Sequence, residues 1–176
     1  MSESPAFRIA QAVGLSGAIW LSGNIFSLSM MAIPALLQSH HEENIPLSTI
    51  TKQWRAIYEF GKARAPPIAL VTAITFLSLA WGARRLAPLS SGPGTGTSAT
   101  TYYICAALTL AVIPWTGLAM GKTNAALIEC AESGWVSDER SGEEVERLLW
   151  KWTWLNAARA LFPLAGGLVG LWGFWT

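Results

Sequence analysis

The chain has 176 residues, of which 52% are hydrophobic and only 13% are charged. Charged residues make up about a quarter of a typical soluble protein, so this composition indicates a membrane protein. The net charge is +1 at neutral pH and the chain has no basic tail, which argues against a nucleic-acid partner. We therefore expect an all-α integral membrane protein that is embedded in the lipid bilayer.

Four apolar segments follow one another, and each is long enough to cross a hydrocarbon core at about 20 residues per helix. They cover residues 9–37, 65–83, 102–121 and 148–175. A helical approach from residue 51 leads into the second segment, where Pro66 and Pro67 indicate a helix break. The third segment is compatible with a helix that extends to residue 131. This pattern predicts a single domain over residues 1–176, built as a four-transmembrane-helix bundle.

Charge placement predicts the orientation in the membrane. Arg8 precedes the first span and Arg84 and Arg85 follow the second, so the positive-inside rule puts both termini in the cytoplasm. The acidic connectors at residues 38–50 and 132–146 then face the lumen or the exterior. The connector between the second and third spans is rich in Gly and Ser and carries no recognisable chemistry. We expect a multi-pass protein of the endomembrane system, and a homo-oligomer is compatible with this expectation.

Polar side chains gather in one half of the predicted bundle. Neighbouring spans run in opposite directions, so the end of the first, the start of the second, the end of the third and the start of the fourth share one membrane half. Tyr58 and Lys62 are four residues apart, and Asn156 and Arg159 three apart, so each pair shares a helical face. The residues expected around a common polar pocket are Asn24, Ser27, Tyr58, Lys62, Asn124, Asn156 and Arg159.

Arg159 is the most informative of these residues. A charged side chain at the bilayer centre costs about 2.5 to 3.5 kcal/mol on insertion scales, so Arg159 should face protein or water. Two interpretations follow. Asn156 and Arg159 either hold helices together through hydrogen bonds worth about 0.6 kcal/mol each, or they belong to a functional site, as ionisable residues inside membranes often do.

Aromatic residues and glycines complete the pattern. Five tryptophans are candidates for walls around a flat aromatic ligand, namely Trp20, Trp54, Trp115, Trp152 and Trp154. The glycines at positions 117, 121, 166, 167 and 170 are more typical of close helix packing than of ligand contact.

The sequence predicts neither a metal nor an organic cofactor. His40 and His41 are adjacent and are the only histidines, so a facial triad or a three-histidine site is poorly supported. A site of one histidine with carboxylates stays open. Cys105 and Cys130 have no CxxC or paired-ligand spacing. The chain also lacks a GxGxxG, a haem-attachment CxxCH and a Walker A motif.

Four stretches of the chain, taken in order, resemble a known family. They are "SGAIWLSGNIFSLSMMAIPALL", "QWRAIYEFGKARAPP", "IPWTGLAMGKTNAAL" and "WKWTWLNAARALFPLAGGLVGL". Their most specific elements are a W-x-x-x-N-x-x-R pattern at residues 152–159 and an S-x-S-x-x-x-x-P pattern at residues 27–34. Together they resemble the four-span membrane anthrone oxygenases of polyketide pathways, over nearly the whole chain.

The resemblance implies oxidation of an anthrone to an anthraquinone by molecular oxygen, without a flavin, haem or nicotinamide. Removing a proton from the anthrone gives an electron-rich anthranolate that can pass an electron to oxygen directly. Such an enzyme needs a base and donors for the oxyanion. The candidate donors are Arg159 and Asn156, with Asn24 opposite them. The candidate bases are Lys62, Tyr58, His41 and His40. The alternative function is a non-catalytic membrane scaffold or accessory subunit for partner biosynthetic enzymes.

Overall fold

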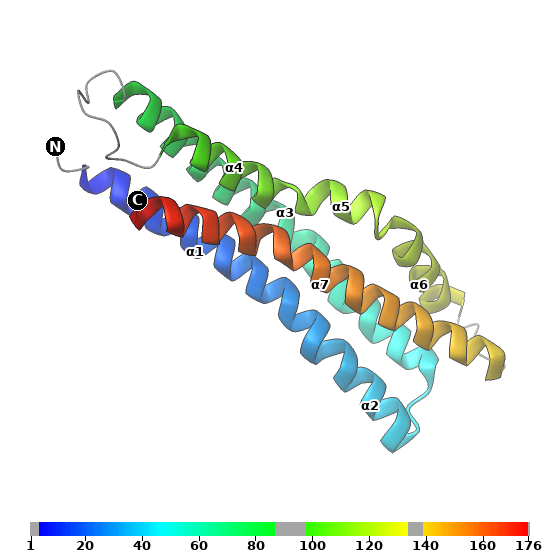
Figure 1. The fold of residues 1–176 in the computed structure, drawn as a ribbon. Helices are drawn as coiled ribbons and strands as arrows, with labels where there is room; N and C mark the ends of the chain where they lie inside the picture. The colour runs from blue at the N-terminus through cyan, green and yellow to red at the C-terminus, as the bar shows by residue number, and fades with distance from the viewer. Residues whose placement is uncertain (1–3, 87–97, 134–138, 176) are drawn as a thin grey trace. The chain divides into compact units, whose positions relative to one another are not determined.

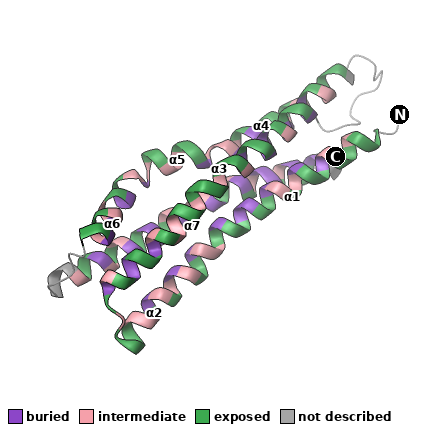
Figure 2. Ribbon diagram, turned by 180° about the vertical axis from the view of Figure 1, so that it is seen from behind, coloured by how far each residue is buried: buried purple, intermediate pink, exposed green. Residues whose placement is uncertain are grey.

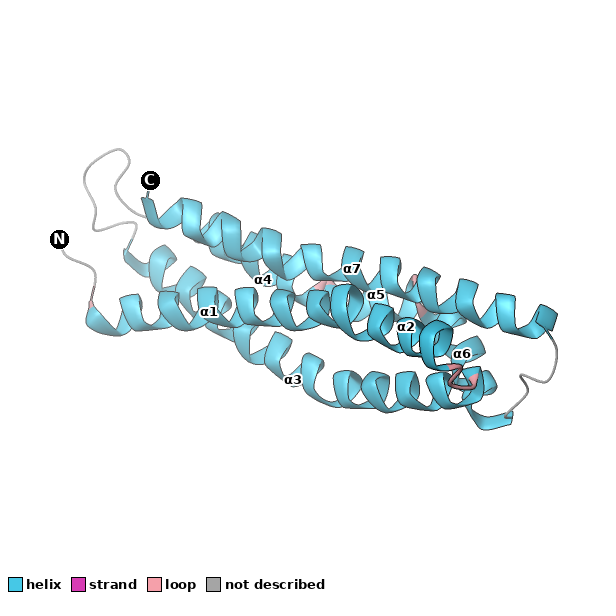
Figure 3. Cartoon of the chain, turned by 90° about the horizontal axis from the view of Figure 1, so that it is seen from below, coloured by secondary structure: helices cyan, strands magenta, loops and turns pink. Residues whose placement is uncertain are grey.

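The computed structural model describes residues 4–86, 98–133 and 139–175, and these residues form helices joined by short loops (Figures 1 and 3). No β-strand occurs in the described part of the chain, so the predicted all-α class is confirmed. Residues 87–97 of the Gly- and Ser-rich connector and residues 134–138 of the second acidic connector lie outside the described residues. The elements are α1 (Pro5–Ser27), the π-helix η1 (Leu28–Ala32), α2 (Ile33–Glu43), α3 (Leu47–Leu86), α4 (Ala99–Leu110), α5 (Val112–Leu118), α6 (Gly121–Ser133) and α7 (Glu139–Trp175).

Three helical segments of the described chain are long and apolar enough to cross a membrane. They are Pro5–Glu43, Leu47–Arg85 and Ala99–Leu118. These spans make the chain a helical membrane protein by length and composition. Helix α7 has 37 residues, but Asn156 and Arg159 interrupt its apolar part. The fourth span therefore stays a prediction.

Pro34 accounts for the irregular joint between α1 and α2. Proline has no backbone N–H, and its ring clashes with the carbonyl four residues earlier in a regular helix. The chain widens here into η1, where the Ile33 amide donates to the Leu28 carbonyl five residues before it. This π-helical turn contains Ser29, which is fully buried. The S-x-S-x-x-x-x-P pattern of the sequence thus marks a π-helix.

The other prolines differ in their effect. The predicted helix break at Pro66 and Pro67 is wrong, because α3 continues through both prolines. Membrane helices tolerate prolines where neighbouring groups satisfy the carbonyls that lose their partners. Pro114 does coincide with a helix interruption. Proline has no N–H to donate to the carbonyl of Leu110 four residues earlier, and α4 ends at Leu110. The third predicted segment is therefore divided into α4 and α5, and α6 continues to Ser133.

Residue contacts divide the chain into two compact units. The first unit comprises Met1–Gly23, Ala65–Ile113 and Ala160–Thr176, and the second comprises Asn24–Arg64 and Pro114–Arg159. The boundary falls inside α1, α3, α5 and α7 rather than in loops. Buried and exposed residues alternate along the helices of both units (Figure 2). The prediction of one domain over the whole chain stays a prediction.

Each unit has its own buried core. The core of the first unit combines Phe76 and Tyr102 with small residues such as Ala18 and Ala73. Glycines bring its helices close together, because a Cβ at Gly166 would lie only 3.1 Å from the Cys105 carbonyl oxygen. A Cβ at Gly170 would lie 2.9 Å from Leu15 Cδ2. These contacts confirm the packing role predicted for Gly166 and Gly170.

The second unit has a core of large side chains. Trp54 and Trp152 are fully or almost fully buried and pack with Leu127, Met120 and Leu149. Gly142 lies close to α3, since a Cβ there would be 3.3 Å from Leu47 Cδ1, but Gly117 and Gly121 have no such neighbour. A Cβ added at position 117 or 121 would meet no atom of the described residues within 4 Å. The packing role predicted for these two glycines is wrong within the described residues, because each faces open space there.

Candidate functional site

Helix α7 carries the centre of the candidate site. Trp152, Asn156 and Arg159 follow one another at spacings of four and three residues, so they share one face of the helix. Trp152 and Asn156 are 2% and 0% exposed, and Arg159 is partly buried. All three belong to the second unit. This face therefore brings an amide and a guanidinium into a largely apolar interior.

Asn156 joins α7 to the π-helical region and to Arg159. Its Nδ2 donates to the Ile25 carbonyl oxygen and to Ser29 Oγ, each at 2.9 Å. Its Oδ1 accepts a hydrogen bond of 2.6 Å from Arg159 Nη2. An amide nitrogen has two N–H donors, and both are used here. The structure therefore favours Asn156 as a residue that orients Arg159, because it has no donor left for an oxyanion.

Arg159 is held from two sides but keeps unused donors. Its Nη1 donates to Thr116 Oγ1 at 2.9 Å, and its Nη2 to Asn156. The buried Nε has no partner among the described residues. No carboxylate of the described residues lies within ion-pair distance, so the cation has no protein counter-ion there. A guanidinium offers five N–H donors, and a buried unpaired cation is costly. This arrangement suits an anionic or electron-rich ligand.

Aromatic residues of α3 lie beside this cation. Trp54 stacks on Tyr58 with ring centroids 5.3 Å apart, and it meets Trp152 edge-on at 5.9 Å. Tyr58 lies near enough to Arg159 to interact with it electrostatically. The indole Nε1 atoms of Trp54 and Trp152 are buried and have no partner in the described chain. Since a buried donor without an acceptor costs about 1 to 3 kcal/mol, these N–H groups also favour a ligand that accepts hydrogen bonds.

The predicted bases lie in three different settings. Tyr58 is partly buried and adjoins Arg159. Lys62 has a 61% exposed side chain, 3.9 Å from Glu59, so the burial that its role as a base requires is absent. His41 contacts Glu146, which lies ten residues before Asn156 on α7, about 15 Å along the helix axis. Of these three, Tyr58 is the one beside Arg159.

The remaining predicted ligand residues are dispersed. Asn24 is exposed, and its carbonyl accepts a hydrogen bond of 2.9 Å from Ser27 Oγ. Asn124 is buried, and its Oδ1 has no partner in the part of the chain that is described. Trp115 is partly buried and donates to the Leu155 carbonyl at 3.2 Å. Trp20 is 52% exposed and belongs to the first unit, and Trp154 is 69% exposed in the second unit.

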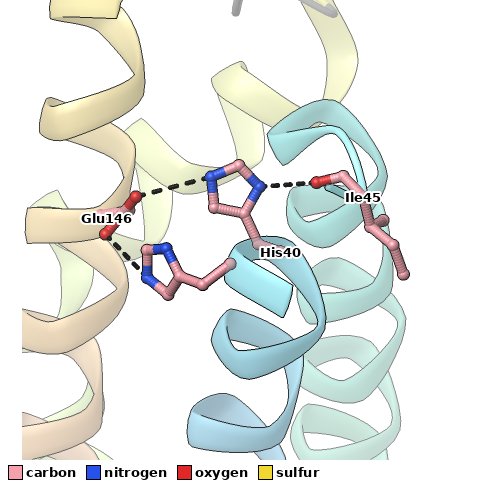
Figure 4. A network of polar contacts seen from close by, with 4 residues as sticks. His40, Ile45 and Glu146 are labelled. Carbon is pink, nitrogen blue, oxygen red and sulfur yellow. Dashed lines mark hydrogen bonds and ion pairs between the residues drawn. The ribbon is translucent and has the colours of Figure 1, made fainter. Parts of the chain in front are cut away.

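One further cluster combines both histidines with a glutamate. His40, His41 and Glu146 lie together, with His40 Nε2 at 3.6 Å and His41 Nε2 at 3.5 Å from the carboxylate oxygens (Figure 4). Two histidines and a carboxylate are the ligand set that the sequence supported poorly. Glu146 is distant in the chain and stands among many acidic residues, so only the tertiary structure identifies it.

The fold and the site define a class of protein: a helical membrane protein with a partly buried arginine that has no counter-ion in the described residues and is flanked by aromatic side chains. Residues 54–169 match the model of the anthrone oxygenase family. The chain belongs to this family.

Relatives agree with this assignment along most of the chain. An anthrone oxygenase of Aspergillus fumigatus is 36% identical over 170 residues, covering 90% of this chain and 88% of the relative. An anthrone oxygenase of Paecilomyces divaricatus is 34% identical and covers 92% of each chain. A noranthrone monooxygenase of Aspergillus flavus is 32% identical, covering 88% of this chain and 68% of the relative. No solved structure matches the chain.

Proposed function

We propose that this chain is an oxygenase that converts an anthrone to an anthraquinone with molecular oxygen, in the biosynthesis of an aromatic polyketide. Membership of the anthrone oxygenase family supports the reaction. We choose the site because of the Arg159 guanidinium. Asn156 and Thr116 hold it in place, and its buried Nε has no partner among the described residues.

The reaction needs no external electron donor, because the substrate supplies the electrons. A base removes a proton from the methylene carbon, and the resulting anthranolate passes one electron to oxygen. The superoxide and the carbon radical then combine to form a C–O bond. Loss of the second C–H proton breaks the O–O bond and leaves a carbonyl. One anthrone and one oxygen molecule thus give one anthraquinone and one water, with no flavin, haem, nicotinamide or redox metal.

Arg159 is the catalytic residue of this proposal. Removal of the first proton places negative charge on the anthrone oxygen, and a fixed guanidinium stabilises that charge without reorganisation. Its planar fork of N–H donors suits an oxyanion better than a lysine ammonium does. Asn156 and Thr116 act as positioning residues, because they hold the two Nη atoms.

Aromatic residues would hold the substrate. Trp54 and Trp152 supply buried indole N–H groups without a partner in the described residues, which suit the hydroxyl and carbonyl substituents of a polycyclic ligand. Tyr58 is the candidate base because it interacts electrostatically with Arg159. The arrangement also favours the catalytic interpretation of Arg159 over a scaffold role, since a purely structural arginine gains nothing from an unpaired donor.

We infer the orientation in the membrane from the positions of the arginines. Arg8, Arg84 and Arg85 favour cytoplasmic termini in an endomembrane, with four spans in all. An apolar polycyclic anthrone would partition into such a membrane and reach the protein from the bilayer. Self-association of the chain is compatible with this arrangement.

The proposal is tested with membranes that carry the protein. Anthrone is added under air, anthraquinone formation is followed by its absorbance, and membranes without the protein give the spontaneous rate. We expect a rate above the spontaneous one that requires oxygen and no added cofactor. A rate equal to that of the control membranes would overturn the proposal.

A further inference from the structure

A second polar cluster stands apart from Arg159. His40 and His41 lie in the last turn of α2, which ends where Asn44 adopts a left-handed backbone with φ of 55°. Glu146 lies on α7, thirteen residues before Arg159, which is about 20 Å along the helix axis. In Figure 4, His40 and Glu146 point toward each other from the two helices. The cluster therefore connects two segments that are distant in sequence.

The spacing of the donor atoms suits a metal ion. One ligand atom from each of His40, His41 and Glu146 lies within 4.8 Å of the other two. The two nitrogen-to-oxygen distances are 3.6 and 3.5 Å. Ligands of a tetrahedral zinc ion, at bond lengths of about 2.0 to 2.2 Å, are separated by about 3.4 Å. Only small side-chain movements would bring all three atoms onto one ion.

The hydrogen bond of His40 fixes its tautomer. Its Nδ1 lies 2.6 Å from the Ile45 carbonyl oxygen, which can only accept, so Nδ1 carries the proton. In the neutral ring, Nε2 then presents a lone pair to a carboxylate oxygen of Glu146. A metal ion between this nitrogen and the carboxylate would be bound by both. A backbone carbonyl bound to the opposite ring nitrogen is also the usual partner of a metal-ligating histidine.

Glu146 has no competing lysine or arginine among the described residues. The neighbouring Arg147 instead forms two hydrogen bonds with Glu144, at 2.8 and 2.6 Å. Among the described residues, no lysine or arginine lies within ion-pair distance of the Glu146 carboxylate. Its negative charge is therefore directed at the two imidazoles alone.

We propose that His40, His41 and Glu146 bind a divalent first-row transition-metal ion of the kind that imidazole and carboxylate ligands take, such as Zn²⁺. The ion clamps the end of α2 to the start of α7, and through Ile45 it also fixes the turn before α3. It lies outside the cluster around Arg159, so its role is to stabilise the fold rather than to activate oxygen. This inference is independent of the oxidation proposed above.

Metal binding is measured on detergent-solubilised protein that carries a tag without histidines. The protein is treated with a chelator, dialysed and titrated with Zn²⁺ by calorimetry, and Co²⁺ is then added to record its visible spectrum. We expect one ion per chain, a higher melting temperature in the metal-bound form, and a Co²⁺ spectrum typical of nitrogen and oxygen ligands. None of these measurements requires an anthrone.

Variants identify the ligands. His41→Ala removes an exposed side chain with no other hydrogen bond in the described residues, so it should leave the fold intact. We expect His41→Ala and Glu146→Gln each to weaken Zn²⁺ binding at least about 10-fold, and to abolish the metal-induced rise in melting temperature. Glu143→Gln is the matched control, since Glu143 is exposed on the same helix outside the cluster. Absence of saturable binding, or equal affinity in the Glu146 and Glu143 variants, would overturn the site.

Discussion

The two compact units are built from the same chain of helices in opposite ways. In sequence, the charged residues of the first unit are confined to Glu3, Arg8, Arg84 and Arg85, and its core relies on alanine and glycine. The second unit contains the other charged residues and both histidines, and its core relies on tryptophan. Small residues let helices approach closely, whereas large aromatic ones surround polar groups and ligands. Close helix packing therefore characterises the first unit, whereas the polar candidate site lies in the second.

We therefore expect substitutions in the two units to have different effects. Substitutions around Arg159 in the second unit should change turnover per folded molecule, and substitutions in the core of the first unit should change stability.

The largest effect is expected at Arg159. Arg159→Leu should lower turnover about 100- to 1,000-fold because it removes a preorganised oxyanion donor. Arg159→Lys, which keeps the charge but loses the planar fork, should be impaired less. Arg64→Leu is the control, since Arg64 is an exposed arginine of the same unit that lies over the Phe60 ring. Anthraquinone formation is measured per molecule of monodisperse protein. Normal turnover with a lower melting temperature for Arg159→Leu would leave the arginine as a structural residue.

A smaller loss of turnover is expected at Asn156. Asn156→Ala frees Arg159 Nη2 and should lower kcat about 10- to 100-fold through misplacement of the guanidinium. KM should change less, because the aromatic surfaces remain. Thr153→Ala is the control, since the buried Thr153 hydroxyl bonds only within its own helix, to the Leu149 carbonyl. A rise in KM with an unchanged kcat would contradict the positioning role.

Glycine substitutions test the close packing of the first unit. A Cβ at Gly14 would lie 2.8 Å from the fully buried ring of Phe76, so Gly14→Ala should destabilise the protein by about 1 to 3 kcal/mol. Gly117 is a matched position in the second unit, where a Cβ meets no described atom within 4 Å. Gly117→Ala should keep or raise the stability, since alanine favours helix by about 1 kcal/mol. Melting in detergent measures both. Equal melting temperatures for the two variants would contradict the packing difference.

The smallest effect concerns the two thiols, one in each unit. Cys105 is fully buried in the first unit, and Cys130 is partly buried in the second. Burial raises the pKa of the Cys130 thiol, and the charges of Glu129 and Glu144 raise it further. Because the thiolate is the reactive form, Cys130 should react slowly with iodoacetamide at neutral pH and faster as the pH rises. Cys105 should react only on unfolding. Mass spectrometry of Cys130→Ala and Cys105→Ala identifies the labelled thiol, and faster labelling of Cys105 would contradict the burial difference.

Helix positions were predictable because hydrophobic length is a local signal. The four apolar segments correspond to helical regions, although Pro66 and Pro67 do not break α3 as expected. The π-helix was not predicted, since the same Ser and Pro spacing is compatible with a simple kink. Its detection required the backbone bond from Ile33 to Leu28.

The candidate site was predictable in part. The spacing of Asn156 and Arg159 placed them on one face, and this is observed. Sequence reasoning did not reveal that both N–H groups of the Asn156 amide bind Ile25 and Ser29. These partners lie 131 and 127 residues away in the chain. The contact of Glu146 with two histidines depends on tertiary structure in the same way.

The most direct test uses the purified protein in detergent, freed of metal by chelation and supplied with an anthrone and ¹⁸O-labelled oxygen. Oxygen uptake and anthraquinone formation are recorded together, after subtraction of the spontaneous rate. We predict one oxygen molecule consumed per anthraquinone, one labelled oxygen atom in the new carbonyl, and a rate that depends on Arg159. A rate no higher than the spontaneous one, or full activity only after a metal or organic cofactor is added to folded protein, would contradict this account.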